Sequence, residues 1–170
     1  MKILVFSDSH GKTYNMEKAI KMHKDTSDCV FFLGDGLRDV NTMKQVYGDR
    51  LFFTSVCGNC DSPLLALNGE PAVQMINLEG FRFMLTHGHL HSAKSTLDRL
   101  VYSARENGAD AVIFGHTHNP ENIYLPPINE ADKPLYVFNP GSISKPNYGN
   151  PTYGIIDIRN GQIMFSHGEI

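Results

Sequence analysis

Short runs of consecutive apolar residues recur along this chain, and several are separated by segments with helical spacing. The first run, residues 3–6, has the length of a strand, and an unbroken apolar strand is one that is buried on both faces. Strands of this kind belong to sheets that are covered by helices, so the pattern favours an α/β fold. The other segments predicted to be strands are 29–33, 51–56, 72–78, 81–86, 111–114, 122–125, 135–138, 152–158 and 162–166.

Three segments have apolar residues at helical spacing, between the predicted strands. They cover residues 16–23, with Asn15 as the expected N-cap, residues 40–47, and residues 97–104, which Gly108 is expected to end. The second half of the chain is richer in strands and in short turns of the hairpin type. Alternating strands and helices followed by hairpins predict two packed sheets with helices outside, in a single domain of residues 1–170.

Residue types that bind metal ions follow five of the predicted strands. The five sequences are Asp8-Ser9-His10, Gly34-Asp35, Gly58-Asn59-Cys60-Asp61, His87-Gly88-His89 and Gly115-His116-Thr117-His118. Ligands bind at the carboxyl ends of strands in open α/β sheets, and glycine allows a tight turn beside them. One such sequence alone predicts little, whereas five at equivalent strand ends predict a metal site. Imidazole, carboxylate and amide oxygen together suit Mn, Fe, Zn, Co or Ni rather than a structural zinc site.

The composition narrows the classes of protein to which the chain can belong. Hydrophobic residues make up 41% and charged residues 19%, as in globular proteins. The net charge of -3 argues against a stable complex with nucleic acid. No apolar stretch reaches the ~18 residues of a membrane span, and no signal peptide precedes the first strand. With three cysteines, an odd number, we expect reduced thiols, a cytoplasmic location and no contact with membranes.

The motifs D-x-H, G-D, G-N-x-D, H-G and G-H-T-H, in this order from Asp8 to about Ser144, resemble those of the calcineurin-like metallophosphoesterase superfamily. The short chain, the G-N-C-D form and Asn139-Pro140-Gly141-Ser142 are similar to the small YfcE-type phosphodiesterase branch. The resemblance implies a four-layer αββα sandwich of two mixed sheets, with a dinuclear metal site at the carboxyl ends of strands. It also implies a phosphodiesterase that uses in-line attack by a metal-bridging hydroxide. Phosphomonoester hydrolysis is the alternative reaction.

The resemblance assigns two divalent ions to this site. One ion would be held by Asp8, His10, Asp35 and His118, and the other by Asp35, Asn59, His87 and His116, with Asp35 as the bridge. Asn59 and His87, together with Cys60, are the expected catalytic residues. Manganese is the expected metal, with iron, zinc, cobalt and nickel as alternatives. The expected substrate is a small phosphate ester or a nucleotide.

Cys60 departs from the common form of the superfamily, which has histidine at this position. That histidine is thought to contact the phosphate and to protonate the leaving group. A thiol with its usual pKa of about 8.5 is protonated at neutral pH and can donate a hydrogen bond to phosphate, but it is a poorer general acid than histidine. Cys57 and Cys60 also form a C-x-x-C sequence, which is typical of redox sites. We expect Cys57 instead to be a buried apolar residue at the end of a strand.

Other residues near these motifs have two interpretations. His89 and His91 lie in the pocket or are exposed loop residues, and Arg38 and Lys145 contact substrate phosphate or are ordinary surface charges. For the whole chain, the alternative is a non-catalytic scaffold similar to the small phosphoesterase-like subunit of retromer. A scaffold has no need of a complete ligand set, and this chain has all seven positions.

Overall fold

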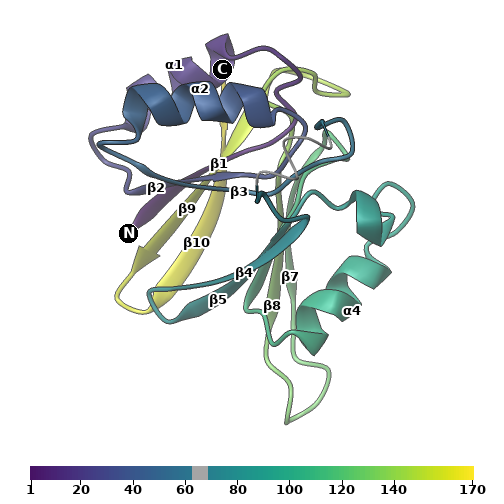
Figure 1. The fold of residues 1–170 in the computed structure, drawn as a ribbon. Coiled ribbons are helices and arrows are strands. Elements are labelled where there is room, and N and C mark those ends of the chain that lie inside the picture. The colour runs from purple at the N-terminus through teal and green to yellow at the C-terminus, as the bar shows by residue number, and fades with distance from the viewer. Residues whose placement is uncertain (63–68) are drawn as a thin grey trace.

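The computed structural model describes residues 1–62 and 69–170, and its strands form two five-stranded sheets packed face to face (Figure 1). The first sheet has the order β10-β9-β1-β2-β3 and consists of β1 (Lys2–Phe6), β2 (Cys29–Phe32), β3 (Phe52–Ser55), β9 (Thr152–Arg159) and β10 (Gln162–Glu169). The second has the order β4-β5-β6-β8-β7 and consists of β4 (Val73–Leu78), β5 (Phe81–Thr86), β6 (Ala111–Ile113), β7 (Pro120–Leu125) and β8 (Leu135–Pro140).

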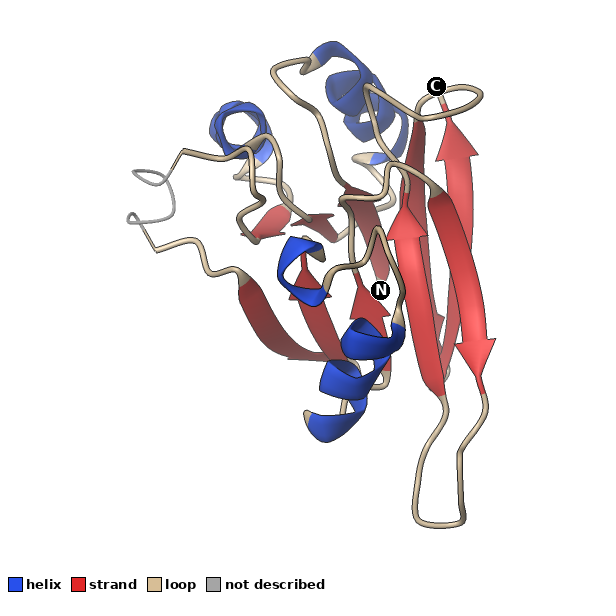
Figure 2. Ribbon diagram, turned by 90° about the vertical axis from the view of Figure 1, so that its right-hand side faces the viewer, coloured by secondary structure: helices blue, strands red, loops and turns tan. Residues whose placement is uncertain are grey.

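Helices lie on the outer sides of the two sheets (Figure 2). The helices of the described residues are α1 (Tyr14–His23), α2 (Leu37–Tyr47), α4 (Asp98–Glu106) and the short 3-10 helix η1 (His89–His91). α1 and α2 cover the first sheet, and α4 covers the second. This is the predicted αββα sandwich. None of the helices in the described part of the chain is long and apolar enough to cross a membrane.

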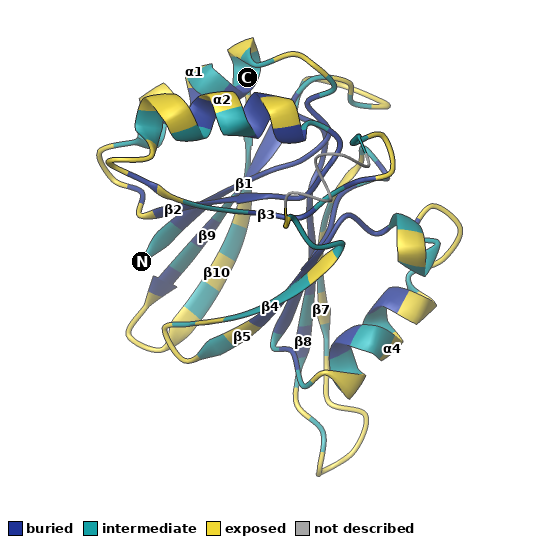
Figure 3. Ribbon diagram, viewed as in Figure 1, coloured by how far each residue is buried: buried dark blue, intermediate teal, exposed yellow. Residues whose placement is uncertain are grey.

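The burial of β1 explains why residues 3–6 of this strand are all apolar. Ile3 and Val5 point into the core between the sheets, whereas Leu4 and Phe6 pack beneath α1 and α2. All four side chains are completely buried. The ribbon of the central strands is correspondingly dark blue in Figure 3. The same alternation places Phe31 in the core between the sheets and Phe32 under the helices. A sheet covered on both faces therefore requires the unbroken apolar runs seen in the sequence.

Both sheets are mixed, and their centres are parallel. β1, β2 and β3 run parallel to one another, and so do β5, β6 and β8. The antiparallel strands β4, β7, β9 and β10 complete the sheets. Parallel central strands bring their carboxyl ends to one edge of each sheet, and the loops that follow them carry the predicted metal ligands.

The predicted strands are all present, and the predicted hairpins are confirmed. Glu79 and Gly80 join β4 to β5 with positive φ angles of 49° and 84°, as a two-residue type I′ turn requires. Asn160 and Gly161 join β9 to β10 in the same way. β10 extends to Glu169, beyond the predicted end at residue 166, because it pairs with β9 along its whole length.

The prediction of Asn15 as the N-cap of the first helix is wrong. α1 begins at Tyr14 with Thr13 as its N-cap, and no side chain caps it. Asn15 lies inside the first turn, where its amide Nδ2 donates a hydrogen bond of 2.9 Å to the carbonyl of Ile143. The side chain thus fastens the helix to the loop between β8 and β9, a long-range contact that the local sequence does not indicate.

Phe31→Ala should test how much stability the core between the sheets supplies. Phe31 is 1% exposed, and its ring meets the edge of Phe83 from the opposite sheet at 5.9 Å between centroids. We expect the free energy of unfolding, measured in urea, to fall by about 3–5 kcal/mol, the usual cost of deleting a buried aromatic ring. Phe52→Ala on the neighbouring strand is the control, because Phe52 is 80% exposed and should change stability by less than about 0.5 kcal/mol. Equal losses in the two variants would contradict this account of the core.

Candidate metal centre

The loops at the carboxyl ends of the central strands are bonded to one another. After β1 and β2, the amide of Asp8 donates to the carbonyl of Gly34, and the amide of His10 donates to that of Asp35, both at 3.0 Å. Across the two sheets, the amide of His116 donates to Asp8 Oδ2 at 3.0 Å. These bonds bring residues that are more than a hundred positions apart in the sequence into one site.

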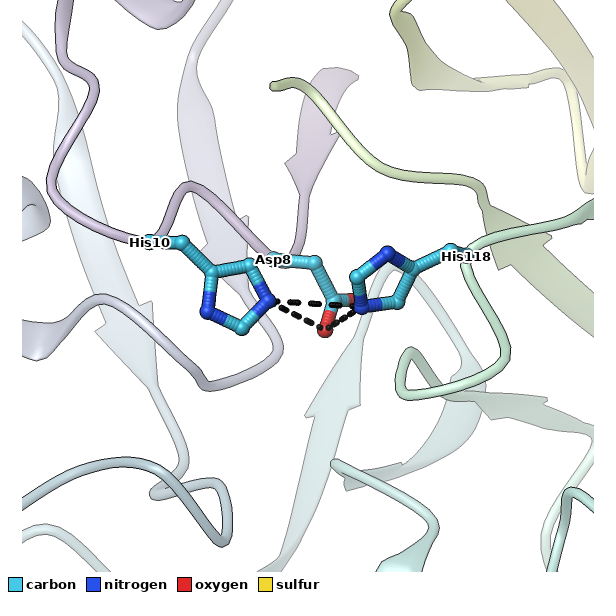
Figure 4. Close-up of side chains that lie close together, drawn as sticks. All are labelled: Asp8, His10 and His118. Atoms are coloured by element: carbon cyan, nitrogen blue, oxygen red, sulfur yellow. Dashed lines mark hydrogen bonds and ion pairs between the residues drawn. The ribbon is translucent and has the colours of Figure 1, made fainter. Parts of the chain in front are cut away.

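Asp8, His10 and His118 form the first group of facing ligand atoms (Figure 4). His118 Nε2 lies 3.2 Å from Asp8 Oδ1, and the Nε2 atoms of His10 and His118 lie 3.3 Å apart. His10 Nε2 lies 3.8 Å from Asp8 Oδ1. Two imidazole nitrogens and a carboxylate oxygen directed at one point are a donor set that suits a divalent transition metal.

Asp8, Asp35 and His87 form the second group, which is continuous with the first. His87 Nε2 lies 3.4 Å from Asp35 Oδ2 and 3.9 Å from Asp8 Oδ1. His10 Nε2 also lies 3.9 Å from Asp35 Oδ2. Asp35 thus has one histidine of each predicted metal position beside the same oxygen, as a bridging ligand needs.

Two polar atoms at the centre of the site have no hydrogen-bond partner among the described residues. They are Asp8 Oδ1 and His87 Nε2, and both side chains are completely buried. A buried polar atom without a partner is costly, so such atoms are rare in native proteins. A bound cation satisfies both of them, and the residues present therefore fit a metal ion.

Hydrogen bonds behind two of the histidines fix the direction of their rings. His87 Nδ1 lies 2.6 Å from the carbonyl of Leu33, and His118 Nδ1 lies 2.6 Å from the carbonyl of Lys145. A carbonyl can only accept, so Nδ1 carries the proton in each ring. In the neutral rings, the lone pair of Nε2 then faces the cluster, which is the arrangement of metal-binding histidines.

Five of the predicted ligands have left-handed backbone conformations. Their φ angles are 58° at Asp8, 47° at His10, 58° at Asp35, 68° at His116 and 60° at His118. Residues other than glycine seldom adopt positive φ, and such strain concentrates at functional sites. The backbone therefore bends sharply at the points where a ligand side chain must be turned into the site.

Two carboxylates that were not predicted as site residues hold the ligand loops in place. Asp61 accepts four hydrogen bonds of 2.8 Å, from the amides of Asp35, Gly36, Leu37 and Gly58. The G-N-x-D sequence contained Asp61, but nothing in it indicated these partners.

Asp39 is the second of these carboxylates. It accepts hydrogen bonds from the hydroxyl of Ser9 and the amide of Gly11, and so ties α2 to the loop after β1. No sequence signal distinguished this residue from an ordinary acidic residue in the first turn of a helix.

The remaining predicted residues lie around this centre. The rings of His116 and His89 lie 4.9 Å and 5.4 Å from that of His87, and 6.1 Å from each other. Asn59 is exposed, and its amide donates to the sulfur of Cys60 at 3.3 Å. His91 is half-buried in η1, and no contact with the predicted ligands is recorded for it among the described residues.

Cys60 lies beside the metal cluster. Its amide donates to Asp35 Oδ1 at 2.7 Å, and its sulfur lies within 4.8 Å of ligand atoms of His10 and Asp35. Burial and the neighbouring Asp35 carboxylate raise the pKa of the Cys60 thiol to about 11.

Cys57 is half-buried against the core beneath α1 and α2, and is more exposed than expected. The three cysteines are free thiols.

Charges within the site shift several other pKa values. Burial alone would raise the pKa of Asp35, but the neighbouring His87 outweighs it and holds that pKa well below its usual range. The neighbouring Asp8 carboxylate raises the pKa of His118. Burial, assisted by His87, lowers the pKa of His116 to about 4. Asp35 is therefore a carboxylate and His116 a neutral ring near pH 7, which are the states that metal binding requires.

Comparison with known proteins gives three results. The model of the calcineurin-like phosphoesterase superfamily domain matches residues 1–161. Phosphodiesterase YfcE of Escherichia coli strain K12 is 32% identical over 175 residues, covering 92% of this chain and 88% of the relative. The structure of a predicted phosphoesterase from Streptococcus pneumoniae superposes with a TM-score of 0.77 at 26% identity, covering 99% of this chain and 88% of the other.

A structure of Vps29 from Entamoeba histolytica in complex with zinc is also similar, with a TM-score of 0.71. The identity is 18%, and the alignment covers 99% of each chain. At this identity the similarity concerns the fold alone.

Asp61→Asn should weaken the site without removing a ligand. Each carboxylate oxygen of Asp61 accepts two amides, so an amide NH₂ in place of one oxygen leaves two backbone donors without an acceptor. We expect the free energy of unfolding, measured in urea, to fall by roughly 2–4 kcal/mol. Metal affinity should be about 10–100-fold lower, as for other residues that orient ligands. Asp49→Asn, at an exposed position, is the control. Unchanged metal affinity in Asp61→Asn would show that these loops need no such support.

Proposed function

The chain belongs to the calcineurin-like phosphoesterase superfamily, and from this we propose that it is a metal-dependent phosphodiesterase with two divalent ions in its site. The observation that carries the proposal is the pair of buried, unpartnered atoms Asp8 Oδ1 and His87 Nε2 at the point where the ligand loops meet. A phosphodiesterase of the same superfamily is 32% identical over most of the chain.

We assign the two ions to the ligand groups as the resemblance suggested. Asp8, His10, Asp35 and His118 hold one ion, and Asp35, Asn59, His87 and His116 hold the other. The distances among Asp8, His10 and His118, and between Asp35 and His87, support this assignment, whereas Asn59 and His116 are assigned from the resemblance. The position of Asp35 beside both His10 and His87 supports its bridging role. Such ions, when bound, activate water as a nucleophile and stabilise negative charge on the phosphate. Manganese is the first candidate, and iron, zinc, cobalt and nickel also suit these ligands.

The side chains around the ions orient the ester. A thiol with the usual pKa of about 8.5 is protonated near pH 7, so Cys60 can donate a hydrogen bond to a phosphate oxygen, and the amide of Asn59 donates to its sulfur. A protonated thiol is a weak general acid and a weak nucleophile. This arrangement favours esters whose leaving group departs without a proton. It also argues against a redox role for Cys57 and Cys60.

The catalytic unit that we propose is one domain, residues 1–170, acting on a small phosphate ester or nucleotide in the cytoplasm. Both sheets contribute ligands, so neither sheet alone would form the site. A scaffold without catalysis is the weaker alternative, because the chain is 32% identical to a phosphodiesterase over most of its length but only 18% identical to Vps29.

Asp35→Asn should cause the largest loss of metal among single ligand substitutions. Asp35 is proposed to serve both ions, and the amide removes the charge that both require. We expect about two divalent ions per wild-type chain, as a two-metal mechanism needs, and a much lower content in the variant. Elemental analysis after dialysis measures both. Asp49→Asn, the same change at an exposed position, is the control and should keep its metal. Full occupancy in Asp35→Asn would refute the bridging assignment.

Hydrolysis of bis(p-nitrophenyl) phosphate tests the reaction itself. The wild-type protein loaded with Mn²⁺ should release nitrophenol, and exhaustive chelation should abolish the release until metal is restored. His118→Ala, folded as judged by circular dichroism, should be nearly inactive because one ion loses an imidazole ligand. Activity that survives chelation would exclude the metal mechanism. A strong preference for alkyl monoesters would overturn the assignment to diesters.

A further inference from the structure

A cavity of about 500 Å³ adjoins the metal centre and extends beyond it. Its lining includes His10, Asp35 and Cys60 of the metal centre and the basic residues Arg38 and Lys145. Sites for small organic ligands have volumes of about 300–1,000 Å³. The cavity therefore has room for more of a substrate than the phosphate that is cleaved.

The two basic residues of the cavity have no acidic partner among the described residues. The lysines and arginines that form ion pairs there are Lys21, Lys24, Lys44, Arg105, Lys133 and Arg159. Both Arg38 and Lys145 are exposed at the cavity. Their charges are therefore available to a bound anion.

The acidic residues Asp39 and Asp61 of the cavity accept hydrogen bonds from other groups. Asp61 accepts four backbone amides, and Asp39 accepts the hydroxyl of Ser9 and the amide of Gly11. Both carboxylates line the cavity, and their hydrogen bonds direct their oxygens at the ligand loops. Neither is within ion-pair distance of Arg38 or Lys145 among the ion pairs of the described residues.

The backbone at Arg38 and Lys145 is held by hydrogen bonds that also hold the ligand loops. The carbonyl of Lys145 accepts the hydrogen bond from His118 Nδ1, and its amide donates to the hydroxyl of Ser142 at 2.8 Å. Arg38 lies in the first turn of α2, directly after Leu37, whose amide is held by Asp61. The points from which the two side chains extend are thus held by the same bonds that position the ligand loops.

We infer that Arg38 and Lys145 form a second anion subsite, which binds an additional phosphate group of the substrate. The substrate class is a phosphodiester that also carries a phosphate monoester, such as a nucleotide diester with a terminal phosphate. A planar guanidinium matches two phosphate oxygens at once, and an ammonium adds a compact charge. The inference rests on the proposed phosphodiesterase function.

Two substrates that differ in one phosphate test the inference by kinetics. They are the p-nitrophenyl ester of thymidine 5′-phosphate and the same ester with a 3′-phosphate, so leaving group and diester are identical. With the metal-loaded wild-type protein, the 3′-phosphorylated ester should have the lower KM. Arg38→Gln and Lys145→Gln should each reduce this preference about three- to fivefold, the effect of one solvent-exposed ion pair. Arg99→Gln, an equal loss of charge at an exposed position on α4, should leave it intact.

Binding without turnover separates this inference from the proposed reaction. Calorimetry should show that thymidine 3′,5′-bisphosphate binds the metal-loaded protein more tightly than thymidine 5′-monophosphate, with an advantage that shrinks as salt is raised. Arg38→Gln and Lys145→Gln should remove this advantage, and Arg99→Gln should keep it. If neither ester is hydrolysed but the advantage is present, the reaction assignment fails and the subsite stands. Equal affinities in the wild type, or equal weakening of both ligands by the substitutions, would overturn the subsite.

Discussion

Two carboxylates, Asp8 and Asp35, are almost completely removed from water at the edge where the two sheets meet. Oxygens of both lie within 3.9 Å of the same buried nitrogen, His87 Nε2. Burying like charges this close is costly unless positive charge lies between them. The site is therefore incomplete as a protein structure alone, and a divalent cation is the group that its charges require. The arrangement of the neighbouring loops follows from this need.

The fold holds the buried carboxylates by combining strained backbone conformations with hydrogen bonds that fix the loops around them. Asp8 and Asp35 each follow a strand that is buried on both faces, and each has a left-handed backbone conformation. Such conformations cost about 1–3 kcal/mol each and persist only where surrounding bonds determine them. Asp61 supplies bonds of this kind to the loops after β2 and β3, and Asp39 supplies them between α2 and the loop after β1. The ligand loops are thus held in position by hydrogen bonds within the chain.

The elements that depend on local pattern were predictable, and those that depend on tertiary contacts were not. The apolar runs predicted strands buried on both faces, because alternate residues of β1 lie in different cores. Glu79-Gly80 predicted a hairpin because its turn type is set by two residues. Asn15 was expected to cap α1, but its amide bonds to a loop 128 residues away. The role of Asp61 was equally hidden, since its four partners are backbone amides that have no sequence signature.

The thiol of Cys60 and the unpaired cations of the cavity have consequences for the same reaction. A thiol whose pKa is raised to about 11 gives little help to a basic leaving group, so the chain lacks a source of catalysis that histidine would supply. A remote part of a substrate also contributes binding energy. This energy can offset the missing proton transfer when it holds the reacting phosphate in position in the transition state. Arg38 and Lys145 are attached to the ligand loops, so a phosphate bound to them would orient the scissile group relative to the ions. On this view, the reaction depends more on positioning and electrostatics than on proton transfer, and a second anionic group on the substrate is what makes the site selective.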